Sequence, residues 1–408
     1  MKQDRKFPIA IISKKAENTL RNGHVWVYDT EIREIKCEIV NGCIVDVVSE
    51  KGTYMGSGFI SENSKIRLRI LSKNANETFG PQFFARRVKY AIDYRRTAMG
   101  DDFYCCRLIF GEADGLPGLT VDRYNNIIVT EVLSYGAEQR KDVIYRALYD
   151  ELKAECPELS IYERNESQTR ALEGLEQYKG WYKADYLTIP ESPVTQIIEN
   201  GIKYSVDVEN GQKTGFFLDQ KYNRLAAAKI AKGKRVLDCF THTGSFAMNA
   251  AAGGAAHVTA VDISQSAIDM ARSNVKLNGF EDRFDFMCCD VFELLPKLLA
   301  ERPGEYDYII LDPPAFTKSR KTASDAERGY KEINYRAMRL LPRGGYLATC
   351  SCSHFMDNER FRRMLISAAH DADVQLRLIE ERRQGPDHPI LMNVPETDYL
   401  KFYLFQIV

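Results

Sequence analysis

The segment that decides the fold is Arg235–Phe246, which reads Arg-Val-Leu-Asp-Cys-Phe-Thr-His-Thr-Gly-Ser-Phe. Its apolar first half is typical of a short buried strand, and the small residues of 245–252 predict a helix directly after it. Gly244, between the two, allows the backbone to pass close to a ligand, and the helix start offers free N–H groups. A dinucleotide-binding turn has the spacing G-x-G-x-x-G, and this turn contains a single glycine, which argues against NAD.

Strand and helix patterns alternate outward from this segment, starting near residue 200. Further strands are expected at 257–262, 284–290, 306–312 and 346–351, with an amphipathic helix over 264–277 and helical stretches between the later strands. Residues 399–408 are also strand-like. This alternation predicts a mixed α/β fold in which an open, mostly parallel sheet is covered by helices on both faces.

An aspartate ends each of four consecutive predicted strands. These residues are Asp238, Asp262, Asp290 and Asp312. Open α/β sheets bind ligands beyond the carboxyl ends of their strands, so the four carboxylates are expected at one site. Asp262, 24 residues after Asp238, stands where an acid can hold a ribose diol, and Asp290 can accept a hydrogen bond from an adenine amino group. A single strand-end aspartate is usually a helix cap or turn residue, but four in succession favour a nucleoside-type ligand.

Two motifs that follow the later strands indicate which kind of reaction the site could carry out. Asp312-Pro-Pro-Ala-Phe316 has two prolines that fix the backbone, and this rigid ledge suits a flat base held beside a reactive cofactor, although a stiff turn has the same pattern. Within 349–353, Cys350 and Cys352 share one strand face. A buried strand cysteine is usually an inert apolar group, but Cys352 lies at the carboxyl end, where a thiolate could attack an unsaturated ring.

The chain is expected to have three domains. Residues 1–75 contain half-buried strand patterns and predict a small β-rich module. A hairpin signal at 119–124 and 127–133 falls in a central segment, 76–190, and the last domain covers 191–408.

A basic stretch spans the first boundary, with aromatic residues among the cations. It contains Lys65, Arg67, Arg69, Arg86, Arg87, Lys89, Arg95 and Arg96. Cations and rings in this mixture suit RNA phosphates and bases. A solvated sheet face and an amphipathic linker helix explain the same pattern, so the stretch alone does not identify an RNA-binding surface.

Composition sets limits on the function. Of 408 residues, 56 are Lys or Arg and 57 are Asp or Glu, so the net charge of −1 gives no global attraction to nucleic acid, and an RNA-binding surface must be local. No apolar run reaches the ~18–20 residues of a membrane span, and the apolar stretch 7–12 is too short for a signal peptide. The ten cysteines contain no CxxC pair and no metal-binding cluster with histidine. These features predict a cytoplasmic protein with reduced thiols, without a metal site and without a membrane partner.

Several of these motifs together resemble one enzyme family. They are Gly111–Gly118, Gln212–Gln220, Asp238–Phe246, Asp312–Phe316, Ser351–Ser353 and Asp387–Pro389. In this combination the sequence is similar, over essentially the whole chain, to the bacterial 23S ribosomal RNA large-subunit methyltransferases that make 5-methylcytosine. His24-Val-Trp-Val-Tyr28 also matches an early segment of that family, with Val25 in place of a proline. The resemblance implies an N-terminal PUA domain, a central α/β domain and a class I Rossmann-like methyltransferase domain with a mostly parallel seven-stranded sheet.

The resemblance also implies a role for each motif. S-adenosylmethionine would be the cofactor, with Asp262 at its ribose, Asp290 at its adenine and the backbone of Gly244 at its amino-acid part. The remaining cofactor-binding candidates are Lys213, Thr214, Gln220, Asp238, Phe240 and Thr241. Cys352 would be the nucleophile that attacks cytosine C6, and Asp312 would contact the N3/N4 edge of the ring. The substrate-binding candidates are Pro313, Pro314, Phe316, Arg86, Arg87 and Lys89.

Three other functions remain as alternatives. Related RNA methyltransferases act on a guanine nitrogen and share the D-P-P-x-F motif but lack the cysteine, so Ser351-Cys-Ser353 favours carbon methylation. A second alternative is a catalytically degenerate RNA-binding factor of ribosome assembly, against which intact Asp262, Asp290, Asp312 and Cys352 argue. A dehydrogenase is least favoured, because of the single glycine in the turn. The expected partner is 23S ribosomal RNA, and similar proteins are often homodimers.

Overall fold

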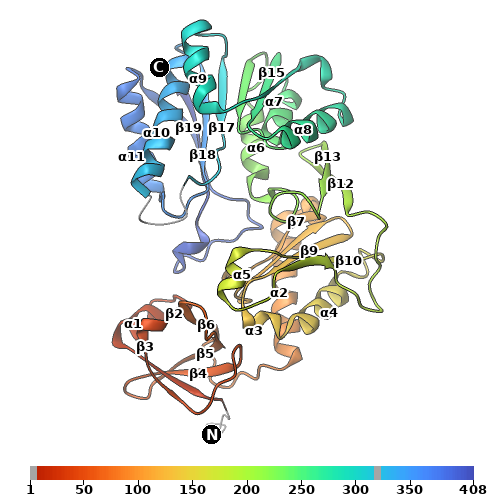
Figure 1. Cartoon of the computed structure of the whole chain (residues 1–408), viewed down its shortest axis with the longest axis vertical. Coiled ribbons are helices and arrows are strands. Elements are labelled where there is room, and N and C mark those ends of the chain that lie inside the picture. The colour runs from red at the N-terminus through yellow and green to blue at the C-terminus, as the bar shows by residue number, and fades with distance from the viewer. Residues whose placement is uncertain (1–6, 317–322) are drawn as a thin grey trace. The chain divides into compact units, whose positions relative to one another are not determined.

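The computed structural model describes residues 7–316 and 323–408, and these fall into two compact units (Figure 1). The first unit extends to Ile197 and also contains Val206–Leu218 and Pro386–Thr397. The second unit contains Ile198–Ser205, Asp219–Gly385 and Asp398–Val408. The expected domain boundaries, after residues 75 and 190, stay predictions. In the described parts of the chain, no helix is long and apolar enough to cross a membrane.

A β-sheet packed on a short helix begins the first unit. Among the residues described before α2, six strands pair in the order β2-β6-β5-β4-β1-β3. Their bounds are β1 Ile9–Ile12, β2 Trp26–Tyr28, β3 Ile32–Lys36, β4 Ile44–Ser49, β5 Tyr54–Ile60 and β6 Ile66–Ser72, and helix α1 covers Lys14–Arg21. Alternating apolar residues of β4 and β6, among them Val45, Val47 and Leu68, share one core with Leu20 of α1. The predicted β-rich module is therefore confirmed.

The rest of the first unit is built on a second sheet, with the strand order β11-β10-β9-β8-β7. Its elements are α2 Pro81–Met99, β7 Cys105–Phe110, β8 Leu119–Tyr124, β9 Ile127–Val132, α3 Tyr135–Glu138, α4 Lys141–Leu152, β10 Ser160–Asn165, α5 Gln168–Leu172 and β11 Tyr178–Trp181. Strands β8 and β9 form the predicted hairpin, antiparallel from Leu119 opposite Val132 to Tyr124 opposite Ile127. Asn125 takes a φ of 56° at its turn, a conformation that asparagine tolerates better than most residues.

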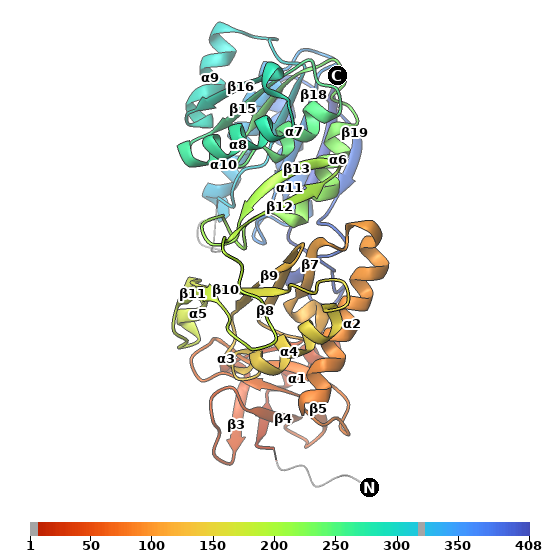
Figure 2. The same cartoon turned by 90° about the vertical axis from the view of Figure 1, so that its right-hand side faces the viewer.

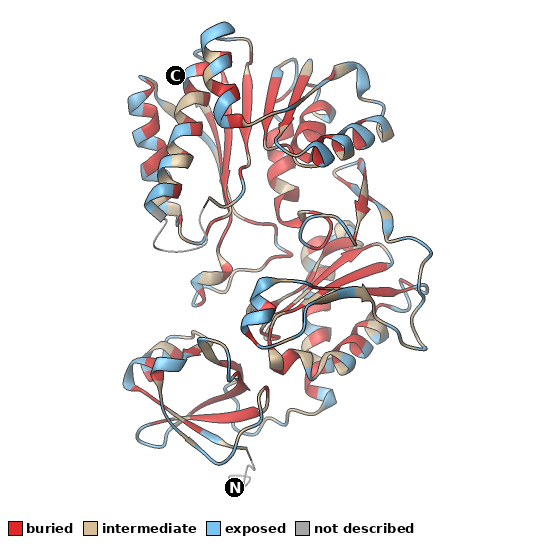
Figure 3. Cartoon of the chain, in the orientation of Figure 1, coloured by how far each residue is buried: buried red, intermediate tan, exposed pale blue. Residues whose placement is uncertain are grey.

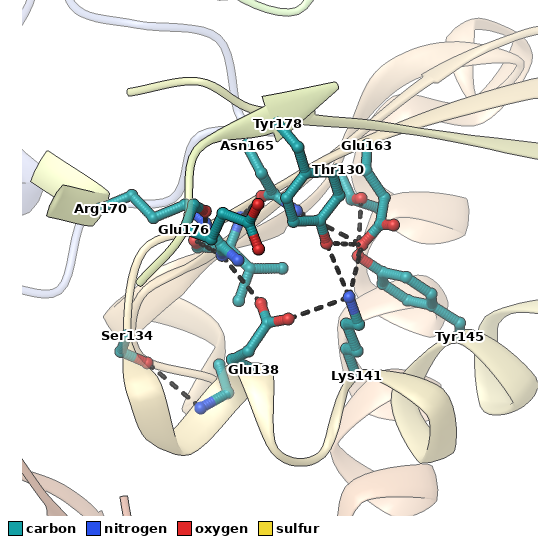
Figure 4. A network of polar contacts seen from close by, with 12 residues as sticks. Thr130, Ser134, Glu138, Lys141, Tyr145, Glu163, Asn165, Arg170, Glu176 and Tyr178 are labelled. Carbon is teal, nitrogen blue, oxygen red and sulfur yellow. Dashed lines mark hydrogen bonds and ion pairs between the residues drawn. The ribbon is translucent and has the colours of Figure 1, made fainter. Parts of the chain in front are cut away.

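A buried polar network fixes β10 to its neighbours in this sheet (Figure 4). The carboxylate of Glu163 accepts hydrogen bonds from Tyr178 of β11 at 2.9 Å and from Tyr145 of α4 at 3.1 Å, and the ammonium of Lys141 lies 3.2 Å away. Lys141 also pairs with Glu138 at 2.9 Å and donates to Tyr178 at 2.6 Å. Burial alone would lower the pKa of Lys141, but these partners raise it, so the lysine stays charged and holds the helix against the sheet.

The second unit has a larger sheet at its centre, in which the described strands follow the order β16-β15-β14-β17-β18-β20-β19. Their bounds are β14 Arg235–Cys239, β15 His257–Asp262, β16 Phe284–Cys288, β17 Tyr308–Leu311, β18 Tyr346–Ser351, β19 Leu376–Arg382 and β20 Lys401–Ile407. Strands β14 to β18 are parallel to one another, whereas β20 runs antiparallel to both β18 and β19. The predicted mostly parallel sheet is confirmed.

Helices cover both faces of this sheet, as Figures 1 and 2 show. They are α6 Lys221–Ala228, α7 Ser245–Ala252, α8 Gln265–Leu277, α9 Val291–Glu301, α10 Ala323–Leu340 and α11 Asn358–Asp371. On one face, Leu295 of α9, Ile333 of α10 and Phe361 of α11 share a core with Leu237 and Ile309 of the sheet. Helices α6 to α8 lie on the other face. Figure 3 shows the result: the central strands are buried, and the outward sides of the helices are exposed.

A short hairpin precedes α6. It consists of β12 Val194–Glu199 and β13 Ile202–Asp207, which pair as a two-stranded sheet. The turn end of the hairpin, Ile198–Ser205, belongs to the second unit. The first residues of β12 and the last residues of β13 belong to the first unit.

Candidate active site in the second unit

The carboxyl ends of parallel strands meet at one edge of the second unit's sheet. Along that edge, Asp290 follows β16, Asp262 ends β15, the Gly244 turn follows β14, Asp312 follows β17 and Cys352 follows β18. Neighbouring strands lie about 4.8 Å apart, so these residues are brought close together, as the sequence predicts. Asp262 and Asp290, the acids expected at a nucleoside, lie on one side of β14. Asp312 and Cys352, the residues expected at the reacting base, lie on the other side.

The turn between β14 and α7 has an unusual backbone conformation. Phe240 and His242 have φ angles of 65° and 52°, in the left-handed region that non-glycine residues seldom occupy, and Gly244 has a φ of 82°. A Cβ on Gly244 would lie 3.1 Å from the Cβ of Ala271 on α8, so a side chain there would crowd that helix. The N–H of His242 donates to Asp262 at 2.9 Å and ties the turn to β15. Backbone strain of this kind is typical of turns that fit a ligand.

Asp238 lies inside the protein. It has no exposed surface, and its Oδ2 accepts hydrogen bonds from the hydroxyl of Thr241 at 2.6 Å and from the N–H of Ala247 at 2.9 Å. Burial raises the pKa of Asp238 to about 7. We expected Asp238 and Thr241 to touch the cofactor. Both side chains form hydrogen bonds inside the protein that shape the turn and the first residues of α7, and their contact with the cofactor stays a prediction.

Asp262 and Asp290 keep acceptor capacity at the edge of the sheet. Both are partly exposed. The two oxygens of Asp262 each accept one backbone hydrogen bond at 2.9 Å, from His242 and from Ser264, and a carboxylate oxygen has room for a second. Asp290 is the N-cap of α9, and its Oδ1 accepts from the N–H of Phe292 at 2.8 Å. The helix-cap interpretation therefore holds for Asp290, and among the described residues no helix N–H donates to its second oxygen.

The surroundings of these acids fit a nucleoside. Ile263, next to Asp262, is 71% exposed, and Phe292, near Asp290, is 39% exposed, so apolar surface flanks the carboxylates as a purine base requires. The hydroxyl of Thr243, in the turn, is buried and has no hydrogen-bond partner in the described parts of the chain. A buried hydroxyl of this kind costs free energy unless a ligand uses it.

Asp312 lies in a polar cluster directly after β17. The Nε2 of Gln220 donates to its Oδ1 at 2.9 Å, and the side-chain oxygen of Gln220 accepts in turn from Asn223 at 2.7 Å. The thiol of Cys350 contacts both Asp312 and Gln220. Burial, reinforced by the charge of Asp219, raises the pKa of Asp312 to about 6. Gln220 is expected at the cofactor from the sequence, whereas the structure shows it orienting Asp312.

The residues after Asp312 form a platform with one buried and one exposed proline. Pro313 is buried and Pro314 is exposed. The ring of Phe316 packs against Tyr330 and Phe292, with centroids 4.6 Å and 5.7 Å away. The motif is therefore anchored at its aromatic end, and Pro314 presents its ring to solvent.

The two cysteines of β18 differ in their access to a substrate. Cys350 lies within the strand and has no exposed surface, and burial raises the pKa of its thiol well above the usual value. A thiol of this kind stays protonated near neutral pH. Cys352 lies one residue beyond the strand and is partly exposed. Of the two, Cys352 is the one that can present its sulfur to a substrate.

Two expected cofactor residues, Lys213 and Thr214, belong to the first unit. Thr214 is buried, and its hydroxyl donates to Asp122 of β8 at 2.5 Å and lies 3.0 Å from the hydroxyl of Tyr124. Lys213 places its Nζ 4.5 Å from the ring centre of Phe217. The hydroxyl of Thr214 is bonded within the core of the first unit, and its expected cofactor role stays a prediction.

The basic stretch expected to meet RNA is partly internal. Arg69 is buried and pairs with Glu173 at 2.9 Å. Arg95 is fully buried and forms a two-pronged pair with Asp114. These two arginines stabilise the first unit and cannot offer their charges to phosphates.

Arg86, Arg87 and Lys89 lie on α2 and differ in exposure. Arg87 is partly buried, donates to the backbone carbonyl of Leu71 at 3.0 Å and has its pKa lowered by burial, and its expected role in RNA binding stays a prediction. Arg86 pairs with Glu77 at 2.8 Å, and Lys89 pairs with Asp93 at 2.9 Å, both with exposed side chains. Surface pairs of this kind contribute less than about 1 kcal/mol, so a phosphate can replace the carboxylate.

Three residues in the site region of the second unit were not predicted from the sequence. Arg224 of α6 forms a buried ion pair, Tyr399 donates to Asp219 at 2.5 Å, and Lys401 is buried at the start of β20. The signal that could have found Lys401 is a charged residue within the apolar run at 400–405.

Comparisons with known proteins agree with this geometry. The S-adenosylmethionine-dependent methyltransferase family matches residues 118–406, and a PUA-like domain matches residues 10–73. The chain is 38% identical to ribosomal RNA large subunit methyltransferase I of Klebsiella pneumoniae, over 99% of this chain and 100% of that protein. It is 42% identical to the protein of the same name from Photobacterium profundum, over 95% of this chain and 96% of the relative.

A solved structure shares the fold. A protein of Streptococcus mutans that is classed with the SAM-dependent methyltransferases has a TM-score of 0.82 at 20% identity, covering 98% of this chain and 99% of that one. The predicted α/β methyltransferase fold, the N-terminal PUA-like domain and S-adenosylmethionine as cofactor are confirmed. This chain belongs to the ribosomal RNA large subunit methyltransferase I family of S-adenosylmethionine-dependent methyltransferases.

Proposed function

We propose that this protein methylates C5 of a cytosine in large-subunit ribosomal RNA through a transient covalent bond between Cys352 and C6 of the base. The observation that carries the proposal is a partly exposed cysteine directly after β18, beside the strand whose end bears Asp312. The relatives at 38% and 42% identity are named for large-subunit ribosomal RNA, and the PUA-like domain supports RNA as the partner. Methylation of a guanine nitrogen needs no protein nucleophile and would leave Cys352 without a role.

The cofactor supplies an electrophilic methyl group. We assign its ribose hydroxyls to Asp262, whose oxygens are fixed by backbone N–H groups and retain acceptor capacity. The second oxygen of Asp290 and the exposed apolar surface of Ile263 and Phe292 suit adenine. The N–H groups that follow Gly244, at the start of α7, suit a carboxylate, because a helix N-terminus favours negative charge.

Cys352 acts by adding its thiolate to the cytosine ring. Its Sγ forms a bond to C6, and the electron pair of the C5=C6 bond becomes available at C5 for the methyl group. A base at the site then removes the C5 proton, the C5–H electron pair re-forms the double bond, and the electron pair of the Sγ–C6 bond returns to sulfur. The route is needed because C5 of an unmodified cytosine is too weak a nucleophile.

Asp312 stabilises the charge that this addition creates on the ring. A carboxyl group with a pKa of about 6 exchanges its proton near neutral pH, so Asp312 can share a proton with N3 as negative charge builds there. Gln220 fixes the orientation of the carboxyl group. Pro313, Pro314 and Phe316 are proposed to hold the flat base beside it.

Part of the RNA-binding surface is assigned to the first unit. Arg86 and Lys89 keep exposed charges there, and we propose that they contact RNA phosphates. We also propose the three-domain organisation with boundaries after residues 75 and 190, which the PUA-like match to residues 10–73 supports at the first boundary. The homodimer remains a prediction.

The experiment that tests the proposed function follows the C5 hydrogen of the target. Large-subunit RNA that lacks the modification and carries tritium at C5 of its cytosines is incubated with the protein and S-adenosylmethionine. We expect one tritium to be released to water for each methyl group incorporated, because C5 methylation replaces that hydrogen. Methyl incorporation without tritium release would contradict C5 methylation and favour a guanine nitrogen. Cofactor binding without any incorporation would favour the degenerate RNA-binding factor.

Asp262→Ala is expected to weaken S-adenosylmethionine binding by about 1.5–3 kcal/mol, the usual range for hydrogen bonds that involve a charged group. Isothermal titration calorimetry measures the affinity. Asp269→Ala is the matched control, because Asp269 is an exposed acid on α8 of the same unit. Equal affinities of the wild type and Asp262→Ala would remove Asp262 from the cofactor site.

A further inference from the structure

A buried lysine lies against the backbone that follows Cys352. Lys401 begins β20 and stands opposite Ser351, the last residue of β18, in the antiparallel pair. Its Nζ donates to the carbonyl of Ser353 at 2.6 Å and to the carbonyl of Tyr399 at 2.8 Å. The residue is 2% exposed. The ammonium is therefore held in place on the turn that carries the proposed nucleophile.

Among the described residues, this ammonium has no carboxylate partner. Two of its three donors bind carbonyl oxygens, and no ion pair joins it to an acid within residues 7–316 and 323–408. A buried charge without a counter-ion is costly, and burial lowers the pKa of Lys401 to about 8. Negative charge on Cys352 is the strongest influence that opposes this lowering. Asp398 and Asp357 oppose it more weakly, and Arg383 adds to it.

Two further described groups that interact with Cys352 are uncharged near neutral pH. Burial raises the pKa of the Cys350 thiol and of the Tyr330 hydroxyl, and Cys352 raises both further. Neither group supplies the positive charge that stabilises a thiolate. Lys401 supplies it.

We propose that Lys401 is a positioning residue that keeps Cys352 in its thiolate form by holding an ammonium charge beside it. This inference rests on the proposed role of Cys352 as nucleophile. The Cys352 thiol loses its proton to solvent, and the thiolate becomes the anion that the buried ammonium lacks. Lys401 keeps its own proton and makes no bond to the substrate. Negative charge leaves the sulfur when Sγ bonds to C6, and the thiolate–ammonium pair forms again when the product is released.

The charge of Lys401 is present before cofactor or RNA binds, so its effect is measurable in the free protein. The test uses the full chain and the rate at which iodoacetamide alkylates Cys352 between about pH 5 and 10, read by peptide mass spectrometry. In the wild type we expect the midpoint below ~8.5, the ordinary value for a thiol. In Lys401→Met and Lys401→Gln we expect it to rise by about one pH unit or more. Lys401→Arg should restore most of the lowering.

Two controls separate the charge from general damage. Lys229→Met removes an exposed ammonium from the same unit and should leave the midpoint of Cys352 unchanged. Cys288 is exposed, and its alkylation in the same samples serves as the internal standard. Lys401→Gln keeps a donor for the Ser353 carbonyl. If thermal unfolding shows that Lys401→Met does not fold, the alkylation midpoint of Lys401→Gln tests the proposal.

Methyl transfer gives a second readout. At pH 7 the rate of Lys401→Met is expected to fall about tenfold or more, and near pH 9 it should return toward the wild-type rate, because the thiolate then forms without help. A purely structural loss would not be recovered by raising the pH. An unchanged alkylation midpoint in the Met and Gln variants overturns this inference even when Cys352 forms an adduct with RNA. A raised midpoint in an enzyme whose Cys352→Ser variant still methylates overturns the proposed function and leaves the lysine effect standing.

Discussion

Cys352→Ser is expected to abolish methyl transfer and also the covalent complex that the wild type forms with RNA carrying 5-fluorocytosine at the target. A serine hydroxyl is not ionised near neutral pH, so it does not add to C6 as a thiolate does. Fluorine at C5 prevents loss of the C5 substituent, and the wild-type adduct therefore accumulates. Denaturing gel electrophoresis detects it as a band that contains both protein and RNA.

Cys350→Ser is the matched control for this result. Cys350 has no exposed surface, and its thiol contacts Asp312 and Gln220, so a hydroxyl there keeps a polar group in the same position. We expect trapping to persist, with a loss of stability of about 1 kcal/mol. An adduct in Cys352→Ser and none in Cys350→Ser would reverse the assignment. Turnover that neither change affects, with no adduct in the wild type or in either variant, would favour methylation of a nitrogen without a covalent intermediate.

Arg224→Met is expected to destabilise the second unit by about 3–5 kcal/mol, the range for breaking a buried ion pair by removing one partner. The Nε of Arg224 lies 2.7 Å from Oε1 of Glu199, and both side chains are 1% exposed. Its Nη1 also donates to the hydroxyl of Ser245, the first residue of α7, at 3.3 Å. The substitution leaves a buried carboxylate without its counter-ion. Urea denaturation of the full chain, with and without S-adenosylmethionine, measures the loss.

A solvent-accessible ion pair in the same unit is the control for this prediction. Arg336 lies 2.7 Å from Glu332 on α10, and both side chains are accessible to solvent, so Arg336→Met should change the free energy of unfolding by less than about 1 kcal/mol. Adding Glu199→Leu to Arg224→Met should regain much of the loss, because it removes the unpaired charge. A loss below about 1 kcal/mol in Arg224→Met would contradict the view that this buried ion pair stabilises the second unit.

Local patterns were enough to predict the sheet of the second unit. The expected helix 245–252 and the expected strands 257–262 and 346–351 match α7, β15 and β18 residue for residue. These segments are apolar because both faces of the sheet are covered, and that requirement is visible within each segment alone. The placement of Asp262 and Asp312 at one edge follows from the same logic, because parallel strands all end on the same side.

Pairings between distant segments were not predictable in this way. Thr214 donates to Asp122, which lies 92 positions earlier in the chain, and Lys401 donates to the backbone of Ser353, 48 positions earlier. A sequence motif indicates which types of side chain a reaction needs, but it does not indicate which of these side chains are buried in the folded protein. Asp238 shows the difference, since its place in the motif is as expected while one oxygen of its carboxylate bonds the Thr241 hydroxyl inside the protein.

The position of β20 has a consequence for how the enzyme is made. β20 lies between β18 and β19 in the sheet but follows both in the chain. During translation, one side of β18 therefore stays unpaired while α11 and β19 are synthesised, and an open strand edge is a template for association with other chains. That edge of β18 is covered only when residues 401–407 insert beside it. The same insertion places the ammonium of Lys401 on the backbone that follows Cys352, so this contact forms only after β18, α11 and β19 have been synthesised.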